Sequence, residues 1–89
     1  MFNHDQAWVN LGKLYAHQGR YDLAVASYEE VLPKAEALNK VAEASMVEGD
    51  HETALNLLEQ AIRLSPTYFP AAEENLEQLL SMTDTEGGN

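Results

Sequence analysis

The sequence predicts an all-α protein of about five short antiparallel helices, and three observations support that fold class. Ala, Leu and Glu dominate the 89 residues, while aromatic residues make up 8% and β-branched residues are sparse. This composition favours helix over strand. Apolar residues recur at steps of three and four, which is the period of a helix face. Glycine or proline ends each periodic stretch, so the helices are short and the turns between them are tight.

The charge balance restricts the partners that the chain can bind. Fifteen acidic residues stand against five basic ones, a formal net charge of -10. Such a chain repels phosphate backbones and anionic lipid, so we expect neither nucleic acid nor membrane as a partner. No apolar run approaches the ~20 residues of a membrane helix, and the N-terminus lacks the basic and apolar blocks of a secretory signal. We therefore expect a cytoplasmic protein.

The first two expected helices meet at a glycine turn. Asn3 can cap the first helix, with Gln6 three residues later as in a capping box, and Gly19 ends it. The second helix begins at Tyr21 and is predicted to end near Leu32, because a proline inside a helix removes a hydrogen bond. The rival outcome is one long helix kinked at the proline, which two chains could exchange. The inner face of the first helix consists of Trp8, Leu11, Gly12, Leu14 and Tyr15.

The remaining chain predicts three more helices. One begins at or just after Pro33 and ends at Gly49, and Asp50 is well placed to cap the next, which ends before the Ser65-Pro66 break. A fifth helix is expected over residues 70–82. Residues 83–89 are expected to form a loose acidic tail, because they have nothing to bury.

The two halves of the chain repeat each other. When QGRYDLAVASYEEVL is set beneath EGDHETALNLLEQAI, Gly19 aligns with Gly49 and Ala24 with Ala54, a constant shift of 30. Self-similarity of this kind is typical of a solenoid, in which no helix pair buries its own apolar face.

The first unit resembles the tetratricopeptide repeat, whose pattern is W-x2-L-G-x2-Y, A-x3-F and P. Its matching residues are Trp8, Leu11, Gly12, Tyr15, Ala24, Tyr28 and Pro33. A weaker second match consists of Leu38, Val41, Ala42, Gly49, Ala54, Leu58, Ala61 and Pro66. The resemblance implies an α–α superhelix, a single domain over residues 3–82 with repeats at 5–34 and 35–68 and a capping helix at 70–82. Small residues such as Gly12 and Ala24 let paired helices approach closely. The period of 30 is about one helical turn shorter than that of the family, which predicts a short second helix.

The resemblance also implies a protein–protein interaction module in a scaffold or adaptor role. Its concave groove, lined by the first helix of each pair, would hold a peptide or helix of a partner. After Arg63 the chain has acidic residues and no basic one, so a basic or mixed ligand is favoured. The family's carboxylate clamp is not expected, since Val9 stands where its first lysine would be. The groove residues carried over by position are Gln6, Val9, Asn10, Lys13, His17, Glu36, Asn39, Lys40, Glu43, Met46, Val47, Glu73 and Glu77.

Two further expectations concern self-association and catalysis. A two-repeat array is short, so structural self-assembly as a homodimer or larger oligomer, with helix exchange as one route, is the alternative function. Its candidate residues are Phe2, Val9, Met46, Val47, Tyr68 and Phe69. His4, His17 and His51 lack the i, i+4 spacing of a metal site and the chain has no cysteine, so neither a metal nor another cofactor is expected. We do not expect an enzyme.

Overall fold

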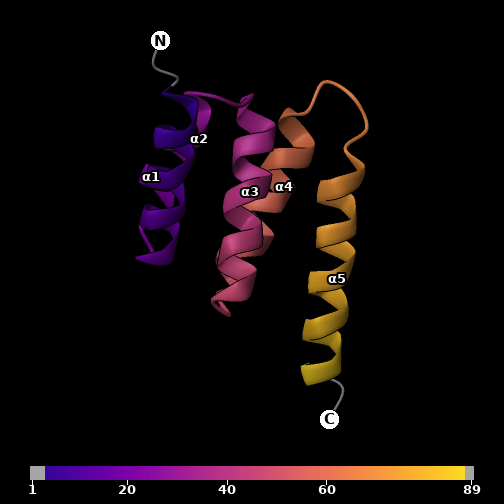
Figure 1. Cartoon of the computed structure of the whole chain (residues 1–89). Helices are drawn as coiled ribbons and strands as arrows, with labels where there is room; N and C mark the ends of the chain where they lie inside the picture. The colour runs from indigo at the N-terminus through magenta and orange to yellow at the C-terminus, as the bar shows by residue number, and fades with distance from the viewer. Residues whose placement is uncertain (1–3, 88–89) are drawn as a thin grey trace.

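The structure, a computed structural model, describes residues 4–87, with side chains described through residue 82. Five helices follow in order: α1 (Asp5–His17), α2 (Tyr21–Glu29), α3 (Lys34–Val47), α4 (His51–Leu64) and α5 (Pro70–Gly87). Helices α1, α3 and α5 lie side by side in one layer, and α2 and α4 form a second layer behind them (Figure 1). The predicted all-α fold class is confirmed, with no strand in the described range.

The two helix pairs close with the same turn. Gly19 and Gly49 have φ angles of 79° and 81°, a left-handed conformation that glycine adopts without strain. In the first turn the Arg20 N–H donates to the carbonyl of Tyr15 at 2.8 Å. In the second the Asp50 N–H donates to the carbonyl of Ser45 at 2.9 Å. Both are the six-to-one bond of a Schellman motif, so the chain reverses identically in the two units.

The helix N-termini differ in how they are capped. The predicted cap at Asp50 is confirmed, because its Oδ1 accepts from the Thr53 N–H at 3.2 Å and its Oδ2 from the Thr53 hydroxyl at 2.9 Å. The proposed cap at Asn3 lies outside the described residues, and α1 is preceded by His4 without a side-chain cap. Gln6 donates instead to Asn10 Oδ1 at 3.0 Å.

The second helix is short, as the period of the repeat predicts. It ends at Glu29, three residues before the predicted end at Leu32, and α3 begins directly after Pro33. A proline disfavours helical geometry in the residue before it, so α2 ends before Leu32. The chain continues as a non-helical turn, in which the Leu32 N–H donates to the carbonyl of Tyr28 at 2.8 Å. The structure therefore has two helices here, not one long helix kinked at Pro33.

The fifth helix is longer than predicted. Its backbone remains helical to Gly87, five residues beyond the expected end at Met82, so residues 83–87 are not a loose tail in this structure. The segment TDTE contains neither glycine nor proline, and nothing in it stops a helix before the glycine pair. Residues 88 and 89 of the predicted tail lie outside the described range.

The core is centred on α3 and contains the close approach that the sequence predicts. Ala24, Val41 and Leu58 are fully buried there. A Cβ atom added at Gly12 would lie 2.9 Å from two ring carbons of Tyr28, closer than real Cβ contacts allow. The absence of a side chain at residue 12 is therefore what lets the Tyr28 ring of α2 pack closely against α1.

Two apolar residues of α1, Trp8 and Leu14, are more exposed than the sequence predicts. Trp8 and Leu14 are 37% and 52% exposed, although the sequence pattern places them on the inner face. Neither residue, nor Leu11 between them, belongs to the apolar core cluster. Within the described chain, α1 packs on α2 and α3 only, so no helix covers its outer side.

Candidate partner-binding groove

Two hollows lie on the face formed by α1, α3 and α5, which we call the α1–α3–α5 face. The first, of about 180 Å³, separates α1 from α3 and is lined by Lys13, His17, Tyr28, Ala44, Val47 and Glu48. The second, of about 330 Å³, adjoins α3 and the start of α5 and is lined by Leu32, Glu36, Asn39, Lys40, Glu43, Phe69 and Ala71. Seven of the predicted groove residues line these two hollows.

The first hollow combines an aromatic side chain with an apolar rim. Tyr28 is 6% exposed, and Val47 at the rim is 83% exposed. Burial, with a smaller contribution from the nearby Glu43 carboxylate, raises the pKa of the Tyr28 hydroxyl, so this group stays protonated at neutral pH and can donate a hydrogen bond. His17 Nδ1 lies 3.8 Å from Glu48 Oε2, an ion pair only when the imidazole is protonated.

Two residues that line the second hollow, Asn39 and Glu43, also make the contact between α3 and α5. The Asn75 amide of α5 donates to Asn39 Oδ1 and to Glu43 Oε2, both at 3.0 Å. Asn39 and Glu43, which the sequence predicts to contact a ligand, thus also hold α5 in place. Sequence reasoning missed Asn75, although its position three residues after Ala72 puts an amide on the inner face of α5, a signal that was available.

The remaining predicted groove residues line neither hollow. Gln6 and Asn10 are exposed and bonded to each other. Val9 and Met46 are partly buried and pack against the core. On α5, Glu77 is exposed. Sequence reasoning also missed Leu32, Ala44, Glu48 and Ala71 as lining residues; the hollows follow from the spacing between helices, which has no local signal in the sequence.

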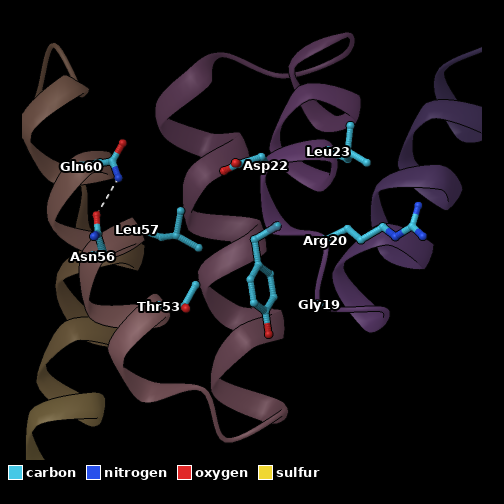
Figure 2. Close-up of a pocket in the computed structure, with 9 residues that line it drawn as sticks. Gly19, Arg20, Asp22, Leu23, Thr53, Asn56, Leu57 and Gln60 are labelled. Atoms are coloured by element: carbon cyan, nitrogen blue, oxygen red, sulfur yellow. Dashed lines mark hydrogen bonds between the residues drawn. The ribbon is translucent and has the colours of Figure 1, made fainter.

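A third hollow, of about 510 Å³, lies on the opposite face between α2 and α4. It is open because α4 packs on α3 and α5 and does not contact α2. In Figure 2, Leu57 and Asp22 project from the two helices into this space, and Asn56 accepts a hydrogen bond of 2.7 Å from the Gln60 amide. The residues lining it are Gly19, Arg20, Tyr21, Asp22, Leu23, Thr53, Asn56, Leu57 and Gln60.

Tyr21, one of the residues lining this third hollow, has a raised pKa. Partial burial is the main cause, and the Asp50 and Glu48 carboxylates add to it by disfavouring a phenolate. No group of three His, Cys, Asp or Glu side chains in the described part of the chain could hold a metal ion. Of the helices in that range, none combines the length and apolar character that crossing a membrane needs.

Comparison with known families agrees with this architecture. Two family models of the tetratricopeptide repeat match the chain, one over residues 5–33 and the other over residues 35–68. The chain belongs to the tetratricopeptide repeat family. Domains of this family generally mediate protein–protein interactions and are typically non-catalytic. Neither the curated proteins nor the solved structures gave a match.

Proposed function

We propose that this chain is a cytoplasmic scaffold or adaptor module that holds an extended or helical segment of a partner protein on the α1–α3–α5 face. The observation that carries the proposal is the pair of hollows on either side of α3. Each combines apolar lining with polar groups, a composition that ligand-binding sites share. The exposed Val47 at the rim offers apolar contact, and the Tyr28 hydroxyl offers a hydrogen-bond donor.

The charge of this face supports a partner segment that is basic or mixed. Glu36 and Glu43 line the second hollow, and Glu77 follows on α5. Lys13 and Lys40 are the basic residues that line the two hollows. A segment with alternating basic and apolar residues would match both the carboxylates and the apolar rim.

Charge reversal tests the proposal directly. The immobilised chain is offered two randomised peptide libraries, one rich in Lys and Arg and the other rich in Asp and Glu. Peptides selected from the basic library should bind, and Glu36→Lys and Glu77→Lys should each weaken that binding by about two- to five-fold, the range for exposed charge pairs. Glu59→Lys, on an exposed position of α4, is the matched control and should leave binding unchanged. Equal losses in all three variants, or selection only from the acidic library, would contradict the proposal.

Self-assembly through the residues that the sequence nominates has less support. Val9, Met46 and Phe69 are partly buried against the core, while Val47 and Tyr68 are 83% and 75% exposed. Phe2 lies outside the described residues. Of the nominated side chains that the structure describes, two therefore offer a largely exposed surface, and no helix spans Pro33 for two chains to exchange.

A further inference from the structure

The first helix pair carries an uncovered apolar surface at its outer end. Trp8, Leu11 and Leu14 follow each other at three-residue steps on α1, and Leu23 lies on α2, which packs against α1. We call these four residues the end patch. Trp8, Leu14 and Leu23 are 37%, 52% and 45% exposed, and none of the four belongs to the core cluster. Figure 2 shows the Leu23 side chain pointing away from Leu57.

The second repeat shows how deeply the positions equivalent to Trp8 and Leu11 are buried when a neighbouring helix pair is present. By the shift of 30 residues, Trp8 corresponds to Leu38 and Leu11 to Val41. Leu38 is 3% exposed and Val41 is fully buried, because α1 and α2 pack on α3. These two positions are thus buried in the second repeat, which has the first helix pair beside it, whereas within the described residues no helix covers the outer side of α1.

The other end of the array, formed by α5, differs from the end patch in both polarity and charge. The described side chains of α5 include Glu73, Glu74 and Glu77 and no basic residue, and its exposed large apolar side chain is Leu80. This surface therefore offers little apolar area to a second molecule. Two α5 ends would also repel each other, because like charges would face each other across the contact.

The end patch lies on a part of the chain that is less acidic than the other end of the array. Helices α1 and α2 and the two residues that flank α2 carry four acidic residues against two basic ones: Asp5, Asp22, Glu29 and Glu30 against Lys13 and Arg20. The described side chains of α5 include three acidic residues and no basic one. Two copies can therefore approach through this end with less repulsion than through any surface that includes α5.

We propose that the end patch binds the end patch of a second copy of this chain, giving a two-fold dimer. An isologous contact closes on itself and leaves both acidic α5 ends pointing outward, whereas a head-to-tail contact would place the apolar end patch against the acidic α5 surface. The dimer joins four helix pairs into one body, which meets the need of a short array for neighbours on its apolar faces. The α1–α3–α5 face remains free, so the dimer presents two partner-binding grooves.

Mass measurements across protein concentration test the dimer. Light scattering of the full chain should approach twice its 9.9 kDa as concentration rises. Leu14→Glu and Leu23→Glu should each return the mass to that of one chain, because each places a charge in an apolar contact. Leu64→Glu, at a 50% exposed position of α4, is the matched control and should leave the dimer intact. Circular dichroism establishes that all three variants remain helical.

Two results would overturn the proposal: a single-chain mass at every concentration, or an equal loss of the dimer in Leu64→Glu. Because the end patch lines neither hollow of the α1–α3–α5 face, a monomeric chain that still binds basic peptides would refute the dimer and leave the proposed function intact.

Cross-linking tests the orientation of the two copies, since the chain has no cysteine of its own. With a short bis-maleimide linker, Leu14→Cys should give covalent dimers, and Gln78→Cys, at an exposed position of α5, should give none. A mixture of the two variants should give dimers of Leu14→Cys chains alone. Links between Leu14→Cys and Gln78→Cys chains would show a head-to-tail arrangement and refute the two-fold contact.

Discussion

The contact between Gly12 and the Tyr28 ring makes a sharp prediction about stability. An added Cβ at residue 12 would lie 2.9 Å from ring atoms Cδ2 and Cε2 and 3.1 Å from Cζ. The ring is 6% exposed, so moving it disturbs buried contacts. Gly12→Ala should therefore force the ring or the helix to shift, which costs ~1–3 kcal/mol. The higher helix propensity of alanine offsets ~0.5–1 kcal/mol of this.

The net effect of Gly12→Ala should be a loss of about 1 kcal/mol in the free energy of unfolding. For a domain of this size that loss lowers the melting temperature by ~4–8 °C. Thermal and urea unfolding followed by circular dichroism would measure both quantities. The change is small enough for the variant to stay folded, so the loss is measured and not inferred from aggregation.

The second repeat supplies the matched control. It has Ala42 and Leu58 at the positions of Gly12 and Tyr28, and both are fully buried. In a Tyr28→Leu background, Gly12→Ala should therefore stabilise the chain by ~0.5–1 kcal/mol, since only the helix-propensity gain remains. The two backgrounds should differ by more than 1 kcal/mol in a double-mutant cycle, given the ~1–3 kcal/mol of overpacking. Equal stabilisation in both backgrounds would refute the steric reasoning.

Three other predictions concern single side chains. Asp50→Ala removes the cap of α4 and should lower the free energy of unfolding by ~1 kcal/mol in urea titrations, while Asp50→Asn, which keeps an acceptor, should lose less. Asn75→Ala leaves the buried Asn39 amide oxygen without its donor, costing ~1–3 kcal/mol, and hydrogen exchange should quicken in α5 before α1; unchanged exchange in α5 would count against this contact. Burial raises the pKa of Tyr28 above its ordinary value of 10.0, so in that pH range the folded state keeps a proton that the unfolded chain releases. Stability should be complete below that pH and fall as pH rises through the folded-state pKa. Tyr28→Phe should reduce this fall in melts across alkaline pH, whereas Tyr68→Phe, at a 75% exposed position, should not.

The structural elements that depend on neighbouring residues were predictable. Gly19 and Gly49 end the first helix of each pair because only glycine adopts the left-handed conformation without strain, and Asp50 caps α4 through a bond to a residue three positions away. Pro33 separates α2 from α3 because it lacks an N–H and restricts the residue before it. The helical range of residues 70–82 in α5 was predictable too. The continuation of α5 to Gly87 was not, because a segment without a helix breaker contains no signal for where the helix ends.

The sequence by itself determined the helix pairs, their glycine turns and the family pattern, because each depends on local geometry or on a spacing that can be read along the chain. Only the tertiary structure decided which faces are covered. Trp8 and Leu38 occupy the same position of the repeat, yet one is 37% exposed and the other 3%, because α1–α2 cover α3 whereas no helix of the described chain covers the outer side of α1. Burial depends on the neighbouring helix pair, and a single repeat does not contain that information.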